Sequence, residues 1–111
     1  MTGWSEVAKL ADLPPGSALE VIHRGRTYAL FRRGDRVFAV DGLCPHQGGH
    51  LARGPVAETE FGAVVTCPRR GCLRWRFDLD SGEGRGGGTA RVGVLGVRVE
   101  GESIFVAWPA P

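Results

Sequence analysis

The sequence lacks any hydrophobic stretch of the roughly 20 residues that a helix needs to cross a membrane. Residues 1–10 also lack the basic start and apolar centre of a secretory signal. We therefore expect a cytoplasmic protein with no membrane partner.

The sequence has no strong excess of either charge. Its 14 Lys and Arg residues against 12 Asp and Glu give a formal net charge of +2. A nucleic-acid-binding domain usually carries a much larger basic excess, so we expect no nucleic-acid partner. The length of 111 residues is typical of one domain with its own core.

No segment sustains the apolar period of an amphipathic helix, whereas 18 glycines and seven prolines divide the chain into short pieces. This pattern predicts an all-β, antiparallel fold of short strands joined by turns. In the segment 36–40, Val37 and Ala39 should point to one face, and Phe38 and Val40 to the other. We expect strands over residues 18–22, 27–31, 36–40, 61–66, 75–79, 91–99 and 104–108.

An odd number of cysteines, three, in a chain expected to be cytoplasmic argues for metal or redox chemistry over a disulfide scaffold. All three lie in or beside two irregular loops that each follow a predicted strand. The first loop, residues 41–55, contains Cys44, His46 and His50, and the second begins at Cys67 and includes Cys72. Two neighbouring strands would present these loops side by side.

The first loop has the composition of a metal-cluster loop. Cys44 and His46 are separated by one residue, so a thiolate and an imidazole can reach the same metal centre. Gly48 and Gly49 follow them, and glycines let a backbone approach closely and donate N–H groups to an anionic cluster.

These motifs resemble those of the Rieske ferredoxin family. The family's C-P-H-x-G-G loop matches residues 44–49, its second-loop Cys-Pro matches Cys67 and Pro68, and its later Gly matches Gly71. The sequence F-D-L at 77–79 also matches. The resemblance implies an antiparallel β-sandwich or barrel base topped by a small two-loop cluster-binding subdomain. It further implies a single domain, 1–111, with cluster-binding loops and hairpin at 41–82 and a base made of 1–40 and 83–111.

The resemblance implies three ligands of a [2Fe–2S] cluster and leaves a fourth open. In a Rieske centre two cysteines hold one iron and two histidines hold the other. Cys44 and Cys67 match the cysteines, and His46 matches the first histidine. The position of the second histidine carries Arg70, whose guanidinium has no lone pair for a metal. Residues 72–74 are an insertion, and the spacer of 20 residues between His46 and Cys67 is longer than usual for the family.

Several hypotheses address this gap. We favour Cys72 as the fourth ligand, because thiolate binds iron well and the inserted residues give the loop slack. His50, which stands where the family usually has proline, is an alternative. A third hypothesis is a cluster-free, Rieske-like interaction subunit of a reductase. A zinc site of three cysteines and His46 ranks last, because Cys44-x-His46 is tighter than the usual C-x2–4-C pairs.

The resemblance implies one-electron transfer to or from a redox protein partner, in an oxygenase or reductase system. We expect an electron-transfer component and not a stand-alone enzyme, because the sequence offers no constellation of acid–base groups for turning over a substrate. Four arginines, 69, 70, 74 and 76, make the second loop basic, which would suit an acidic partner.

Overall fold

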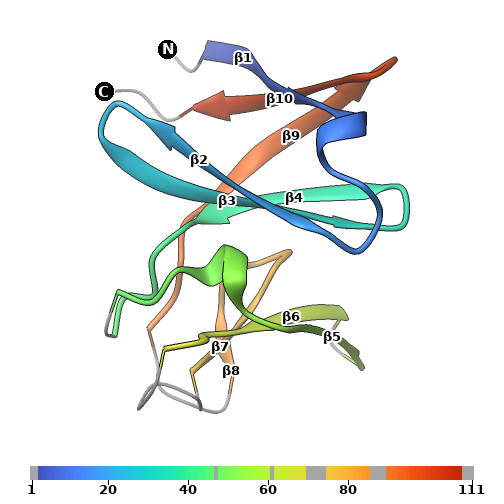
Figure 1. The fold of residues 1–111 in the computed structure, drawn as a ribbon. Coiled ribbons are helices and arrows are strands. Elements are labelled where there is room, and N and C mark those ends of the chain that lie inside the picture. The colour runs from blue at the N-terminus through green and yellow to red at the C-terminus, as the bar shows by residue number, and fades with distance from the viewer. Residues whose placement is uncertain (1–2, 47, 61, 70–74, 86–89, 109–111) are drawn as a thin grey trace.

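The computed structural model describes residues 3–46, 48–60, 62–69, 75–85 and 90–108. Within them the chain forms two antiparallel sheets, a six-stranded sheet that curls on itself and a smaller four-stranded sheet beside it (Figure 1). No α-helix occurs in this part of the chain, which has two 3₁₀ helices, Leu10–Asp12 and Leu51–Arg53. Neither has the length and apolar character needed to cross a bilayer. The predicted all-β fold class is confirmed.

The larger sheet has the strand order β1-β10-β9-β4-β3-β2, and the smaller sheet has the order β5-β6-β7-β8. The larger sheet consists of β1 (Gly3–Lys9), β2 (Ala18–His23), β3 (Arg26–Arg33), β4 (Arg36–Asp41), β9 (Val94–Glu100) and β10 (Ser103–Trp108). The smaller sheet consists of β5 (Val56–Thr59), β6 (Gly62–Thr66), β7 (Arg76–Asp78) and β8 (Gly84–Arg85). The predicted boundary between cluster-binding and basal segments at residue 82 stays a prediction, and the smaller sheet itself ends at β8.

The hairpin of β3 and β4 is buried on both of its faces. The strands pair with Phe31 opposite Phe38, and the turn between them uses Gly34 at φ +60°. Side chains alternate between two separate cores, as strand geometry requires. Leu30 and Ala39 enter one core, whereas Phe31 and Val40 enter the other. The alternation predicted for residues 36–40 is confirmed.

Each face of this hairpin contributes to a different core. The base core lies inside the curled sheet and comprises Leu13, Tyr28, Leu30, Ala39, Ile104, Val106 and Trp108. The site core lies between the hairpin and the smaller sheet. It comprises Ala29, Phe31, Phe38, Val40, Cys44, Leu51, Ala63, Val65, Cys67, Phe77, Leu79 and Val92. Two of the three cysteines therefore belong to the site core.

Three strands lie outside the segments expected from the sequence: β1, β5 and β8. The strand expected at 91–99 is β9, which begins later, at Val94. Before it, Val92 packs into the site core and its N–H donates to the carbonyl of Gly82 at 2.9 Å. This stretch therefore links the smaller sheet to the larger one and joins the main ladder only afterwards.

Candidate cluster site

The first loop closes on itself as a tight turn around Cys44. The N–H of Cys44 donates to the carbonyl of Gly49 at 2.9 Å, and the N–H of Gly48 donates to the carbonyl of Cys44 at 2.7 Å. Gly48 adopts φ +72°, a conformation that favours glycine. The turn places the Cys44 side chain in the site core, where the residue is 2% exposed.

The second loop starts and ends at neighbouring positions of the smaller sheet. The N–H of Cys67 donates to the carbonyl of Trp75 at 2.9 Å, next to the pairing of Thr66 with Arg76 in β6 and β7. Cys67 is fully buried in the site core. Arg70 and Cys72, the residues at the centre of the ligand question, lie outside the described residues.

Gly49 is where the two loops touch. A Cβ atom at this position would lie 2.6 Å from Sγ of Cys67 and 2.9 Å from Cβ of Arg69. Real Cβ atoms do not come this close, so only glycine lets the first loop pass against the sulfur of the second. The site therefore depends on a backbone that packs directly on a thiol.

His46 connects the two loops on the exposed side of the site. It is exposed, and its ring stacks on Trp75 with a centroid distance of 4.3 Å and an interplanar angle of 9°. Trp75 in turn contacts the buried ring of Phe77 in a tilted arrangement at 6.3 Å. A histidine of the first loop is thus held against Trp75, the residue that ends the second loop and directly precedes β7.

His50 faces the base. Its Nδ1 lies 2.5 Å from Oε1 of Glu20 on β2, and the side chain is 41% exposed. It also forms an isolated antiparallel bridge with Leu43. This engagement with a carboxylate makes His50 a link between the first loop and the base.

The described residues fit three positions of a Rieske-type donor set. Cys44 and Cys67 supply two buried sulfurs from two touching loops, and His46 supplies an exposed imidazole. In the described segments no three His, Cys, Asp or Glu side chains already form a metal-binding group. A Rieske-type set has a fourth position, for which the sequence favours Cys72, with His50 as an alternative, and Cys72 lies outside the described residues.

A comparison with protein-family models settles the family. The model for the Rieske-like [2Fe-2S] domain matches residues 3–107. The chain belongs to the Rieske-like [2Fe–2S] domain family. The predicted resemblance is confirmed, and the predicted cofactor, a [2Fe–2S] cluster, is the one for which this family is named.

Known proteins similar to this Rieske-like domain fall into several kinds. It is 34% identical over 79 residues to cholesterol 7-desaturase of Ciona intestinalis, covering 70% of this chain but 16% of the desaturase. A Mycobacterium tuberculosis structure assigned as an NADH-dependent nitrite reductase small subunit is 30% identical, with a TM-score of 0.87 and coverage of 100% and 99%. The ferredoxin of carbazole 1,9a-dioxygenase from Nocardioides aromaticivorans is 28% identical, with a TM-score of 0.81 and coverage of 94% and 96%.

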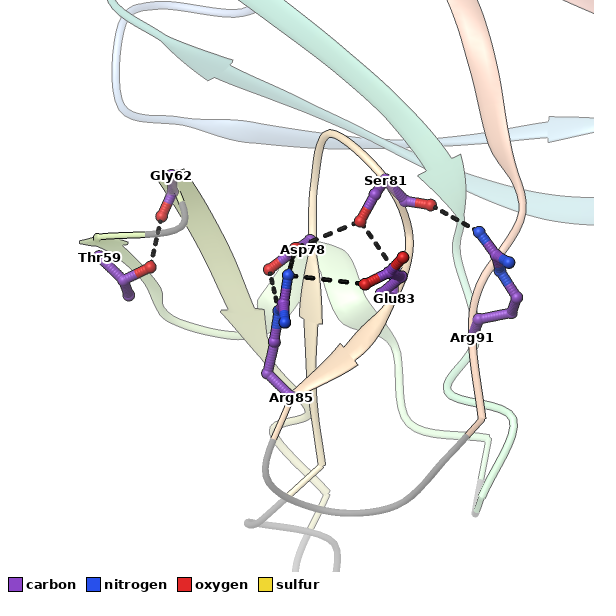
Figure 2. A network of polar contacts seen from close by, with 7 residues as sticks. All are labelled: Thr59, Gly62, Asp78, Ser81, Glu83, Arg85 and Arg91. Atoms are coloured by element: carbon purple, nitrogen blue, oxygen red, sulfur yellow. Dashed lines mark hydrogen bonds and ion pairs between the residues drawn. The ribbon is translucent and has the colours of Figure 1, made fainter.

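A buried ion pair supports the second loop from behind. Asp78, which is 4% exposed, lies between the core residues Phe77 and Leu79 on the chain. Figure 2 shows Arg85 reaching both of its carboxylate oxygens, with Nη2 2.7 Å from Oδ2 and Nε 3.1 Å from each oxygen. Ser81 donates a further hydrogen bond at 3.2 Å.

This pair was missed from the sequence, because no strand was predicted between residues 79 and 91. The hydrogen bonds from the Arg85 guanidinium lower the pKa of Asp78 despite its burial, and the same pair raises the pKa of Arg85. A carboxylate flanked by two large apolar residues was the signal for it, because a buried charge needs a partner. The pair fastens β8 to β7, the strand that follows the second loop.

Proposed function

We propose that this Rieske-like domain transfers single electrons and carries a [2Fe–2S] cluster on Cys44, His46, Cys67 and Cys72. The contact of Gly49 with Sγ of Cys67 carries the proposal, because the loop that contains Cys44 and His46 packs directly on the thiol of the other loop. When bound, such a cluster takes up and gives back one electron.

The surrounding residues suit this role. Both described cysteines are buried, so the sulfurs are shielded from water and from oxidation. His46 is exposed, and its edge is the natural point for an electron to pass to a docked protein. Trp75 fixes the plane of this imidazole by stacking, which limits the freedom of the exposed ligand.

Cys72 is our candidate for the fourth ligand. It lies in the insertion that separates Gly71 from Trp75, within the loop that has lost its histidine. A third thiolate adds negative charge to the cluster, so we expect a midpoint potential below that of a centre with two histidines. The expected range lies between about −150 mV and about −400 mV, the values typical of low-potential Rieske and plant-type centres.

The proposed partner is a redox protein of an oxygenase or reductase system. A ferredoxin of a dioxygenase and a nitrite reductase small subunit both resemble this chain over nearly their whole lengths, which supports either kind of partner. The chain spans only a small part of the cholesterol 7-desaturases, so catalysis of that kind is not part of the proposal.

The test is a spectrum of anaerobically purified protein with iron, zinc and sulfide assays on the same sample. We expect about two iron and two sulfide per chain, visible colour, and an EPR signal after reduction. Cys72→Ser should lower iron content and change the midpoint of any cluster that remains, while Cys44→Ser should abolish the cluster. Unchanged spectra for Cys72→Ser would contradict its role as ligand.

The second candidate is a cluster-free interaction subunit of a reductase. Arg70 at the position of the second histidine favours it, because this side chain cannot bind iron. A colourless, iron-free and well-folded protein would support this candidate and contradict electron transfer. Zinc in place of iron would instead indicate the zinc module.

A further inference from the structure

An open hollow of about 360 Å³ lies between the two loops. Its lining residues are Gly48, Gly49, His50, Arg53, Pro68 and Arg69. Gly49 also touches the sulfur of Cys67, so the floor of the hollow is continuous with the proposed cluster site.

The charged lining of this hollow is basic. Arg53 and Arg69 approach it from different loops, and both residues are exposed. No acidic residue is among the described residues that line it. Glu20, the carboxylate paired with His50, comes from β2 in the base. The overall charge of +2 is too small to attract acidic proteins strongly, so any such attraction is local.

We propose that this hollow receives a carboxylate side chain, Asp or Glu, on the surface of an acidic redox partner. Guanidinium groups bind carboxylates through paired hydrogen bonds, and Arg53 and Arg69 bring two positive charges to the hollow from different loops. Gly48 is exposed, and no atom lies within 4 Å of where its Cβ would stand, so this edge of the hollow is open to an incoming side chain. Docking here brings the partner against the loop that carries His46.

This inference rests on the proposed function for the identity of the partner, but the hollow can be tested without a partner. The probe is a fluorescein-labelled hexaglutamate peptide, whose binding is followed by fluorescence anisotropy at low and at physiological ionic strength. The protein is the full chain as purified, with its iron and sulfide content and reduced EPR spectrum measured on the same sample.

The variants Arg53→Glu and Arg69→Glu reverse one charge each at the hollow, and Arg53→Gln and Arg69→Gln remove it. The matched control is Arg98→Glu, which makes the same change on β9, where Arg98 stacks over Trp4 and pairs with Glu100. We expect each hollow reversal to weaken peptide binding about fivefold or more at low salt, and the control to change it less than about twofold. Circular dichroism melting of every variant confirms folding.

Equal weakening by Arg98→Glu and the hollow variants would overturn the inference, since it would show a response to net charge alone. Failure of the wild-type protein to bind the peptide at low salt would overturn it as well. If the cluster is present but either result is found, the inference fails and the proposed function stands. If the protein is colourless yet binds the peptide through Arg53 and Arg69, the hollow stands and electron transfer fails.

Discussion

A glycine of the six-stranded base and a glycine beside the smaller sheet serve different purposes. In the base, Gly34 adopts φ +60° in a hairpin turn, and no atom lies within 4 Å of where its Cβ would stand. Beside the smaller sheet, Gly54 has an ordinary extended conformation, but its Cβ would lie 2.0 Å from the carbonyl oxygen of Thr66. Gly34 is needed for backbone shape, whereas Gly54, like Gly49, is needed for close contact.

The two cores also differ in the kinds of side chain that they contain. The base core consists of aliphatic and aromatic side chains, while the site core adds the thiols of Cys44 and Cys67. The base can therefore be varied as ordinary hydrophobic packing. Around the site, backbone segments press on one another and on sulfur, so small additions of volume should have large effects.

The largest effect on the free energy of unfolding is expected from Gly54→Ala, and Gly96→Ala is its control. Both backbones can accept alanine, but the nearest atoms to a Cβ at Gly96 lie at 3.5 Å. Gly54→Ala should lower the free energy of unfolding by about 3 kcal/mol, because backbone must move on both sides. Gly96→Ala should change it by about 0.5 kcal/mol or less. Denaturant unfolding measures both, and similar values would contradict the contrast between the two regions.

Asp78→Asn should have the next largest effect. It removes the shorter of two carboxylate contacts of Arg85, whose Nη2 also lies 3.6 Å from Oε2 of Glu83. We expect a loss of about 2 kcal/mol, below the value for a fully buried pair, because the Arg85 side chain is 35% exposed. The folded-state pKa of Asp78 lies below its ordinary value of 3.8. The pair therefore stabilises the fold above this value, and its contribution is lost as pH falls through the folded-state pKa.

Unfolding measured from pH 7 down to pH 2 checks this prediction. The variant should show a shallower loss of stability with acid than the wild-type protein. Asp80 lies two residues after Asp78 and forms an exposed ion pair with Arg36 of β4, so Asp80→Asn is the control. This variant should leave the loss of stability at acid pH almost unchanged. Parallel curves for wild type and Asp78→Asn would contradict the assignment.

A smaller effect on stability, but a specific one on the site, is expected from Trp75→Leu. It removes the ring on which His46 stacks, at a cost of about 1 kcal/mol. Trp75→Phe keeps an aromatic face. We expect the g-values and midpoint potential of the reduced cluster to change in Trp75→Leu and to stay near wild type in Trp75→Phe. Identical spectra for the two variants would show that the stack does not position His46.

The smallest effect is expected from His50→Pro. His50 has φ −78°, which proline accepts, and its N–H lies outside the two hydrogen bonds that flank its bridge with Leu43. Loss of the hydrogen bond with Glu20 costs about 0.5 kcal/mol, and the proline offsets it by stiffening the unfolded chain. Thermal melting should show almost no change in the stability of His50→Pro. Glu20→Gln should be slightly less stable, because it weakens the contact with His50 and has no proline to stiffen the unfolded chain. A large loss in His50→Pro alone would show that the loop needs this imidazole.

The sequence predicted the strands that bury a face and missed those that do not. β3, β4 and β10 contain apolar runs that are buried either on both faces or at alternate positions. These patterns predict strands. β1 and β5 expose most of their residues and are held by backbone hydrogen bonds to β10 and β6. Such strands have no buried face, so their sequences lack the hydrophobic periodicity from which a strand is predicted.

The part of the candidate site that could be predicted from the sequence is the set of residues whose side chains can bind a metal. Cys44, His46 and Cys67 stood out by residue type and spacing. The contact of Gly49 with Cys67 and the stack of His46 on Trp75 depend on how separate loops meet, and no local pattern encodes that. The pairing of Asp78 with Arg85 likewise joins two strands across a turn, and the shortness of β8 concealed it.

The hairpin of β3 and β4 has a consequence for how the molecule opens. Because it is a common wall of both cores, neither core can lose its packing without exposing a face of the same two strands. The amide protons of Ala29, Leu30 and Phe31 should therefore exchange with solvent only through global unfolding, and more slowly than those of β1 or β5. A domain of two sheets is thus expected to unfold as one cooperative unit, with its two candidate cluster loops attached to the part that opens last.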